Sequence, residues 1–402
     1  MKRKIVFACM ISALFLSQTA MAAPNVEVNG TQIDTDAVII DDKTYVPLRG
    51  VFEAAGAEVS WNEETQTAGI NISNSLSDDE LIPSVIESVS PSVVGIIGRG
   101  KTESYYGSQE GIMSGSGVII KTGGEHLFGL LLAGKLHFAL CRSIKTGGEI
   151  LTNAHVVKNM NTILVVMNDG KGYEAQLKYI DEDTDLAVVK IKKIGLPVVK
   201  FANSEDIVVG KQVIAIGTPI TFSLRNSATV GHISGLNRSV GEPYRLVQTD
   251  TAITHGNSGG ALINMNGELV GITSSGYSGT NTNFAVPVDT VKYVLNQFEL
   301  YGKVRHISFG AEFQEDWLAE LGVPSEAGLT IKGLEKSSPL AKASFKNGDV
   351  LVSVDDVAIN SIVELNELMK NYLPGDTVKV GVKTNGEIKY ADIVLDEKAK
   401  TE

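Results

Sequence analysis

The sequence predicts a mainly β protein whose central part is an antiparallel barrel or sandwich. From about Val85 to Phe298, short runs rich in valine and isoleucine follow one another and are separated by glycine turns. The chain has 41 glycines in 402 residues and only 6% aromatic residues, which suits strands and turns better than helices. The one long helical pattern in this region lies at residues 290–300. Helices are therefore too few for a doubly wound sheet.

The first 22 residues have the three parts of a secretory signal peptide. Lys2, Arg3 and Lys4 are basic, residues 5–16 are apolar, and small residues precede a cleavage site after Ala22. We therefore expect an exported protein that is extracellular or associated with the cell envelope, and membrane-anchored if the signal is retained.

The charge and cysteine content of the mature chain limit its partners and linkages. Without the leader, the formal net charge falls from −12 to −15. Such an acidic surface argues against nucleic acid or an anionic membrane as a partner. Only Cys141 remains, so no intramolecular disulfide is possible. No glycine-rich nucleotide-binding motif occurs, and we expect no cofactor and no metal.

A chain of 402 residues is too long for one ordinary core, so we expect three folded units. The first, residues 26–73, has short alternating strand patterns around a short helical pattern. Its segments 46–54 and 56–61 resemble the copper amine oxidase N-terminal-like domain of bacterial envelope proteins. The mature chain has no histidine or cysteine before His126, so the usual imidazole and thiolate copper ligands are missing. We expect a spacer or a module that binds an envelope component, followed by a polar linker at residues 74–84.

The second unit, residues 85–300, carries the candidate catalytic side chains. His155 follows a strand pattern, Asp185 precedes an apolar strand pattern, and Ser258 lies in a glycine-rich bend. Serine is a weak nucleophile at neutral pH and needs an adjacent base, which His155 would supply. A buried Asp185 would hold the imidazole in one tautomer and stabilise its positive charge. The amides of Gly256 and Ser258 would form an oxyanion hole for the developing negative charge.

The order of the three residues, histidine then aspartate then serine, is that of the chymotrypsin class. Together with segments 248–250 and 283–287, these motifs resemble HtrA proteases over roughly residues 91–397. The resemblance implies a chymotrypsin-like double β-barrel and an ATP-independent serine endopeptidase that works through an acyl-enzyme. It further implies degradation of misfolded or unfolded exported proteins in envelope stress response and quality control, by a homotrimer. The alternative on the same fold is a proteolytically silent chaperone or scaffold at the cell envelope.

Two positions near the serine depart from the family pattern or bear on specificity. Thr254 and His255 stand where HtrA proteins commonly have Asn-Pro, which puts His255 beside the oxyanion loop in a structural or a pH-modulating role. By the resemblance, Ala252 belongs to the specificity pocket and lacks the carboxylate that attracts basic side chains. We therefore expect cleavage after small or medium aliphatic residues and weak cleavage after Lys or Arg.

The spacing of Gly256, Ser258 and Gly260 also satisfies the nucleophile elbow of α/β-hydrolases. That fold needs a triad histidine after the serine, and only His306 follows it. The elbow also needs a helix directly after the serine, whereas residues 261–264 indicate a strand leading into a turn. We therefore reject this alternative.

A duplicated pentapeptide marks an insertion ahead of His155. Lys-Thr-Gly-Gly-Glu occurs at residues 121–125 and again at 145–149. Removing residues 121–144 restores an ordinary hairpin that leads to His155. The apparent insertion, residues 122–145, is therefore a late addition whose effect on the triad is left open by the sequence.

The inserted segment is strongly apolar over residues 126–144. It is too short to span a bilayer as a helix. We expect an extended hairpin that turns at residues 133–135. A metal site formed by His126, His137 and Cys141 is the least favoured interpretation, and a tolerated insertion at a hairpin tip is the most favoured.

The third unit, residues 305–398, mixes strands with a helical pattern at residues 362–371. Over nearly its whole length it resembles a PDZ domain of the HtrA kind. The resemblance implies that backbone amides around Phe309, Gly310 and Ala311 bind the carboxylate of a peptide C-terminus. The peptide would add a strand to an exposed sheet edge. A packing domain without a ligand is the alternative.

Overall fold

The chain divides into two compact units, Met1–Asp79 and Glu80–Glu402. The structure is a computed structural model, and no helix among its described residues is both long and apolar enough to cross a bilayer. The expected signal peptide, residues 1–22, lies outside the described residues. These are residues 25–28, 31–33, 37–40, 43–72, 77–104, 107–132, 135–219, 221–277, 279–321, 323 and 327–399.

Within its described residues, the first unit contains three β-hairpins and the short helix α1. Each hairpin is a separate two-stranded antiparallel sheet. Ala37, Ala57 and Val59 are buried. The elements are β1 (Val26–Val28), β2 (Thr31–Ile33), β3 (Val38–Ile40), β4 (Lys43–Tyr45), α1 (Leu48–Ala54), β5 (Ala57–Asn62) and β6 (Thr67–Ile72).

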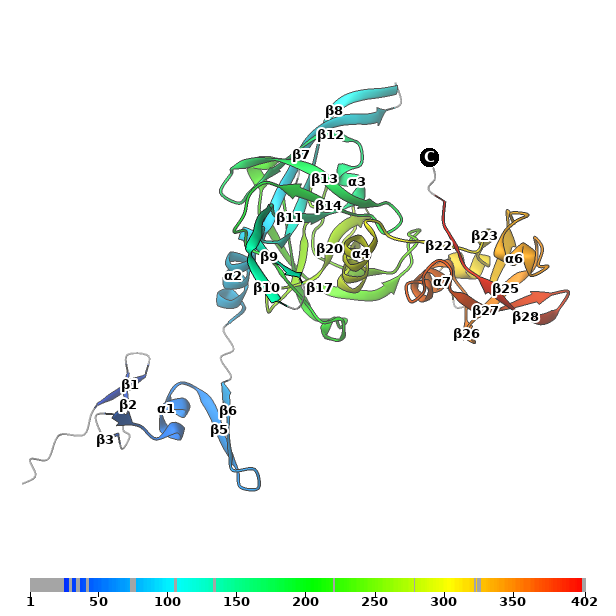
Figure 1. Cartoon of the computed structure of the whole chain (residues 1–402). Helices are drawn as coiled ribbons and strands as arrows, with labels where there is room; N and C mark the ends of the chain where they lie inside the picture. Colours follow the sequence, from blue (N-terminus) through cyan, green and yellow to red (C-terminus); the bar gives the residue numbers. More distant parts are fainter. Residues whose placement is uncertain are drawn as a thin grey trace, which may run out of the picture. The chain divides into compact units, whose positions relative to one another are not determined.

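The second unit contains a closed six-stranded barrel with the strand order β11-β14-β13-β12-β7-β8 (Figure 1). Its interior is filled by aliphatic side chains such as Ile96, Ile119, Ile150 and Val189, which are all buried. A one-turn helix, α3 (Ala154–Val157), follows β11. The strands are β7 (Val93–Ser104), β8 (Gly107–Lys121), β11 (Glu149–Thr152), β12 (Met160–Val166), β13 (Gly172–Asp181) and β14 (Leu186–Ile191).

Six later strands form a second closed ring, because β20 pairs with both β19 and β21. The short β15 adds to β20 as a parallel strand. Helix α4 contacts β20 and β21 and buries Val291, Val294 and Phe298. The mainly β, double-barrel class expected from the sequence is confirmed. The elements are β15 (Lys200–Phe201), β16 (Gln212–Gly217), β17 (Ser227–Arg238), β18 (Leu246–Thr249), β19 (Ala261–Asn264), β20 (Glu268–Gly276), β21 (Asn283–Pro287), α4 (Val288–Tyr301) and the 3-10 helices at Ser90–Ser92, Ser204–Asp206 and Phe222–Leu224.

Helix α2 (Asp78–Val89) occupies part of the expected linker. Its Val85 and Val89 are buried in the same apolar cluster as Phe298 of α4. The polar linker predicted over residues 74–84 therefore gives way to a helix from Asp78 onwards. The apolar residues that follow the acidic start supply the packing that an isolated short helix lacks.

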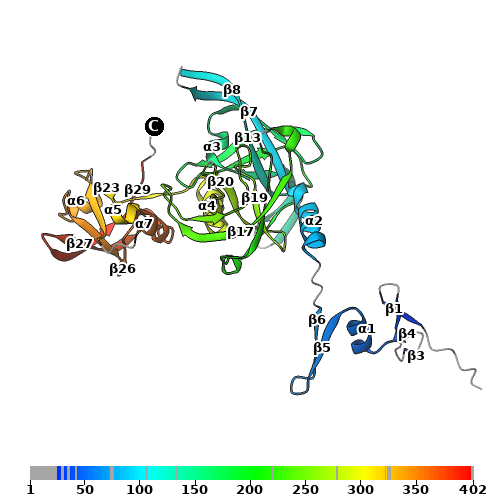
Figure 2. The same ribbon diagram turned by 180° about the vertical axis from the view of Figure 1, so that it is seen from behind.

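The β7–β8 hairpin extends beyond the first barrel. The pairing of β7 with β12 ends at Gly100, whereas its pairing with β8 continues to Ser104 and Gly107. The outer parts of the two strands project as a ribbon in both views (Figures 1 and 2).

The apolar insertion forms β9 (Gly124–Leu132) and β10 (Lys135–Thr146), which pair as an antiparallel hairpin. The extended hairpin expected from the sequence is therefore present, although its turn and its side chains, including those of His126, His137 and Cys141, lie outside the described part. At its base, Lys121 of β8 is the register partner of Glu149 of β11. Lys121 comes from the first pentapeptide and Glu149 from the second, so the hairpin is looped out between two residues that remain paired.

The C-terminal part has its own core and contains short helices. Its main sheet has the order β23-β24-β25-β27-β28, with β26 on β25, and β22 pairs separately with β29. Phe309, Leu329, Ile331 and Val380 belong to its buried cluster. The elements are β22 (Ile307–Ser308), β23 (Glu312–Gln314), α5 (Trp317–Glu320), β24 (Leu329–Lys332), α6 (Pro339–Lys342), β25 (Val350–Val354), β26 (Val357–Ala358), α7 (Ile362–Met369), β27 (Thr377–Thr384), β28 (Glu387–Val394) and β29 (Asp396–Glu397).

Candidate active site

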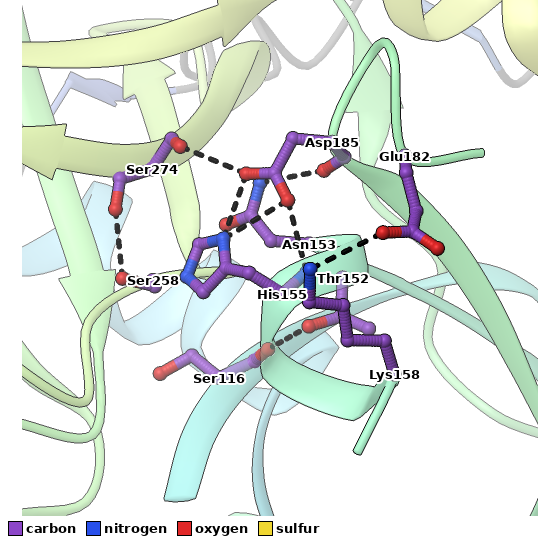
Figure 3. A network of polar contacts seen from close by, with 9 residues as sticks. All are labelled: Ser116, Thr152, Asn153, His155, Lys158, Glu182, Asp185, Ser258 and Ser274. Atoms are coloured by element: carbon purple, nitrogen blue, oxygen red, sulfur yellow. Dashed lines mark hydrogen bonds and ion pairs between the residues drawn. The ribbon is translucent and has the colours of Figure 1, made fainter. Parts of the chain in front are cut away.

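The structure brings His155 and Asp185 into direct contact (Figure 3). His155 Nδ1 lies 2.9 Å from Asp185 Oδ1 and 2.8 Å from Asp185 Oδ2. Because a carboxylate can only accept, Nδ1 carries the proton of this contact, and Nε2 of the neutral ring is left as an acceptor. This is the orientation that a general base needs.

Asp185 is held through its backbone as well as its carboxylate. Its φ of 53° lies in the left-handed region, which aspartate tolerates better than most residues. Its carbonyl oxygen accepts hydrogen bonds from the Ala154 amide at 3.1 Å and from Asn153 Nδ2 at 2.9 Å. Its Oδ1 accepts the amide of His155 at 3.0 Å. The residues that begin α3 are thus fixed against the turn that presents the carboxylate.

Ser258 comes from the second barrel, in the bend before β19. Its hydroxyl donates to the carbonyl oxygen of Ser274 at 2.7 Å and not to His155. Ser274 Oγ in turn donates to Asp185 Oδ2 at 3.0 Å. Figure 3 shows the imidazole between Asp185 and Ser258. The three predicted side chains therefore meet at one site, but the hydrogen bond from the serine hydroxyl to the imidazole is not formed.

The loop before Ser258 is a tight turn. The amide of Asn257 donates to the carbonyl of Thr254 at 2.9 Å, and Gly256, the third residue of this turn, has a φ of 97°. These are the features of a type II turn, which favours glycine at its third position. Within the described residues, the amides of Gly256 and Ser258 donate to no other protein group. Neither amide is therefore committed to another group of the described protein.

Ser116 of β8 ties the first barrel to the serine loop. Its Oγ donates to the Gly256 carbonyl at 2.7 Å and accepts the Thr218 amide at 2.8 Å. Its own amide donates to the Ser258 carbonyl at 2.8 Å. The φ of Gly259 is 86°, and a Cβ there would overlap the carbonyl oxygen of Ser116. The close approach of the two barrels therefore needs glycine after the serine.

Three parts of the chain match known protein families. Residues 140–272 match the trypsin-like peptidase domain, and residues 310–395 match the PDZ domain. Residues 27–79 match the copper amine oxidase N-terminal domain.

The chain is also similar to curated proteases. It is 31% identical over 342 residues to the serine protease Do-like HtrA of Lactococcus lactis, covering 78% of this chain and 82% of that relative. This chain belongs to the HtrA family of serine proteases. It is 30% identical to the serine endoprotease DegS of Haemophilus influenzae and covers 92% of it. It spans 55% of the length of a probable periplasmic DegP-like serine endoprotease of Halomonas elongata, to which it is 36% identical over 263 residues.

Solved protease structures share the fold. The HtrA-type protease AlgW, in a structure with a decapeptide, has a TM-score of 0.63 and 25% identity, covering 79% of this chain and 99% of AlgW. The serine endoprotease from Yersinia pestis has a TM-score of 0.59 and 28% identity, covering 79% and 98% of the two chains.

The sequence did not identify Ser274 or Ser116 as site residues of this HtrA chain. Ser274 lies on β20, 16 residues after Ser258, and Ser116 lies on β8, before the insertion. Neither has a sequence context that separates it from other serines in strands. Their roles depend on contacts between segments far apart in the chain, which single-sequence patterns do not report.

The residues expected to bear on specificity lie at the surface of the same loop. Ala252 is exposed, and its carbonyl oxygen accepts a hydrogen bond from Thr229 Oγ1 at 3.0 Å. His255 is exposed as well. Neither side chain is packed in the core.

In the PDZ loop that is expected to bind a peptide carboxylate, one backbone amide is already hydrogen-bonded to a side chain of the same loop. The amide of Gly310 donates to Ser308 Oγ at 3.0 Å, so a bound carboxylate would have to replace this hydroxyl. Phe309 is buried and packs edge-on against Phe313, with ring centroids 5.8 Å apart. Ala311 leads into β23, which lies at the edge of its sheet. This exposed edge is where an added peptide strand would pair.

Proposed function

We propose that the chain is an ATP-independent serine endopeptidase in which His155, Asp185 and Ser258 form the catalytic triad. The observation that carries the proposal is the contact of His155 Nδ1 with both oxygens of Asp185, at 2.9 and 2.8 Å, beside the hydroxyl of Ser258. Rotation of the Ser258 side chain away from the Ser274 carbonyl gives the hydroxyl access to Nε2.

In the first step, Ser258 Oγ attacks the carbonyl carbon of the scissile peptide and its proton passes to His155 Nε2. Asp185 stabilises the imidazolium that forms. The carbon–nitrogen bond then breaks, and His155 gives its proton to the leaving amine. Water, deprotonated by His155, attacks the resulting ester, releases the acid product and restores the Ser258 hydroxyl.

The free amides of Gly256 and Ser258 are proposed to stabilise the oxyanion of both tetrahedral intermediates. Removing one such donor typically costs about 3 kcal/mol of transition-state stabilisation. The bond from Ser116 Oγ to the Gly256 carbonyl supports this role, because it fixes the peptide unit that follows Gly256.

The substrates we propose are unfolded or misfolded exported proteins, cleaved after small or medium aliphatic residues beside Ala252. Free peptide C-termini would bind at Phe309, Gly310 and Ala311. Export to an extracellular or envelope location follows from the N-terminal leader, and relatives named periplasmic endoproteases agree with it. A homotrimeric state, a stress-response role and an envelope partner of the N-terminal domain complete the proposal.

A proteolytically silent chaperone or PDZ scaffold is the second candidate. The observation that favours it is the hydrogen bond from the Ser258 hydroxyl to the Ser274 carbonyl, which leaves the nucleophile unconnected to its base. The apolar hairpin formed by β9 and β10 just before His155 also fits a chain that has lost its activity.

Casein hydrolysis by the purified chain distinguishes the two candidates. We expect fragments from the wild type and from Ser275→Ala. Ser275 is an exposed serine that directly follows Ser274 on β20, and its variant serves as the matched control. We expect none from Ser258→Ala, with a loss on the order of 10⁴-fold or more. Equal inactivity of the folded wild type and Ser258→Ala would support the scaffold.

A further inference from the structure

The turn before Asp185 is held by a second, buried aspartate. Asp181 Oδ2 accepts hydrogen bonds from Thr184 Oγ1 at 2.6 Å and from the Thr184 amide at 3.1 Å. Asp181 and Thr184 are both buried. Thr184 directly precedes Asp185, whose left-handed φ needs support from its surroundings. The Asp181 carboxylate therefore restrains the residue on which the position of the triad carboxylate depends.

The other oxygen of the same carboxylate is bound by the segment that connects the protease to the PDZ domain. His306 Nε2 lies 2.6 Å from Asp181 Oδ1, and its side chain is only 14% exposed. Because the carboxylate can only accept, Nε2 carries the proton. His306 Nδ1 lies 3.1 Å from the phenolic oxygen of Tyr244, so both ring nitrogens are engaged.

The contacts of Asp181 with Thr184 and those of His306 with Tyr244 meet next to the Asp185 carboxylate. Thr184, Asp185, Tyr244 and Ser274 line the same small cavity, of about 10 Å³. Tyr244 thus borders both the His306 cluster and the triad. Burial raises the pKa of its phenol, which therefore stays neutral and able to donate.

We propose that Asp181 is a positioning residue for the triad and that His306 anchors it. The proposal rests on the proposed function. One carboxylate oxygen of Asp181 fixes the Thr184 turn, and the other is fixed by the ring of His306. The start of the PDZ domain is thereby connected to Asp185 within the second unit. His306 contacts Asp181, Asp181 is hydrogen-bonded to Thr184, and Thr184 is covalently joined to Asp185.

A neighbouring aspartate offers a matched control. Asp183 Oδ2 lies 3.6 Å from His306 Nε2 and accepts a hydrogen bond from Lys398 Nζ at 2.7 Å. It makes no side-chain hydrogen bond to the Thr184 turn among the described residues. Asp183→Asn therefore removes a negative charge beside His306 without removing the restraint on Asp185.

The test compares Asp181→Asn with Asp183→Asn in the mature chain, by kinetics on a peptide substrate and by the low-field proton resonance of His155 Nδ1. For Asp181→Asn we expect kcat to fall about tenfold with KM within about twofold, since misplacement of a catalytic group acts on the chemical step. We also expect its Nδ1 resonance to shift or broaden. Asp183→Asn should leave kcat and the resonance close to those of the wild type.

Equal effects of the two variants, or an unchanged kcat and resonance in folded Asp181→Asn, would overturn the positioning role. If Asp181→Asn does not fold, Thr184→Val removes only the 2.6 Å hydroxyl contact and should change the same two readouts in the same direction. His306→Gln should change kcat and the Nδ1 resonance less than Asp181→Asn does. If His306→Gln changes neither, the anchoring role is overturned. A wild type that shows the resonance but no hydrolysis dependent on Ser258 would refute the proposed function instead.

Discussion

The two barrels contribute to the site in different states. The first barrel supplies His155 and Asp185, which are already joined by two short contacts and fixed by the backbone of α3. The second barrel supplies Ser258, whose hydroxyl is bound to Ser274 within the same barrel. The orienting half of the proposed triad is thus assembled inside one barrel, whereas the proposed nucleophile is bound within the other.

This difference locates the step that separates a resting from a working site. In the proposed mechanism, His155 is already oriented as a base by Asp185 within the first barrel. Only the Ser258 hydroxyl has to exchange one acceptor for another, while Ser116 keeps the two barrels in register. Changes in the first barrel should therefore abolish chemistry, and changes around Ser274 should alter its efficiency.

The largest effect is expected from breaking the first-barrel pair. Asp185→Asn replaces one carboxylate oxygen by an NH2 donor, so the imidazole is no longer fixed in the required tautomer, and we expect kcat to fall on the order of 10⁴-fold, as in other enzymes of this mechanism. The measurement is the hydrolysis of a peptide substrate that has an aliphatic residue immediately before the cleaved bond. Glu182→Gln, in the same turn, is the control. A decrease of less than tenfold in folded Asp185→Asn would contradict the assignment.

A smaller effect is expected from Ser274, which links the barrels. Ser274→Ala removes the hydroxyl that donates to Asp185 Oδ2 but keeps the carbonyl that holds Ser258. A hydrogen bond to a charged group contributes about 1.5–3 kcal/mol, so we expect kcat to fall roughly tenfold or more. Ser275→Ala provides the comparison on the same strand, and equal kinetics of the two variants would show that the link is dispensable.

The fold and the candidate side chains could be predicted from the sequence, whereas several contacts between distant segments could not. Runs rich in Val and Ile and separated by glycine turns predicted an antiparallel barrel or sandwich, because strand patterns are local, and the resemblance to HtrA proteases implied the double barrel. The segments around His155, Asp185 and Ser258 predicted which side chains lie together. The bond from Ser258 to Ser274, the bridge through Ser116 and the contact of His306 with Asp181 were missed, since each joins strands or loops that approach only in the folded chain. The linker at residues 74–84 was assigned from its polar start, whereas apolar contacts of Val85 and Val89 decide the helix.

A third effect concerns the contact of the second barrel with the PDZ domain. Glu367 of α7 lies 2.8 Å from Arg245 Nη2 and 2.8 Å from Lys370 Nζ. Burial alone would raise the pKa of Glu367, but Lys370 and Arg245 outweigh it and the pKa is lowered. A carboxyl with a lowered folded-state pKa adds stability above its unfolded pKa of roughly 4.3 and loses it as the pH falls through the folded value.

Glu367→Gln should therefore lower the melting temperature at pH 7 by about 2–4 °C, corresponding to roughly 1 kcal/mol. The difference from the wild type should shrink as the pH falls from the unfolded pKa of roughly 4.3 through the lowered folded-state pKa, where the wild-type carboxyl becomes protonated. Melting curves across this range, with the exposed Glu387→Gln as control, provide the measurement. A difference that does not depend on pH would exclude the ionic origin.

The smallest effect is expected from removing the inserted hairpin. In the variant that lacks residues 121–144, Lys145 takes the position of Lys121 opposite Glu149, so the register of β8 with β11 is kept. We expect peptidase activity within about twofold of the wild type or above it, because insertions at hairpin tips seldom support the fold. A folded deletion variant without activity would show that the hairpin supports His155.

Covalent labelling with a serine-directed organophosphate tests most directly that an activated serine meets an oriented imidazole. We expect mass spectrometry to find one adduct, on Ser258, formed rapidly by the wild type and at least about 100-fold more slowly by His155→Ala, since only the wild type has the base. Labelling at another residue, or equal rates for the wild type and His155→Ala, would contradict the account.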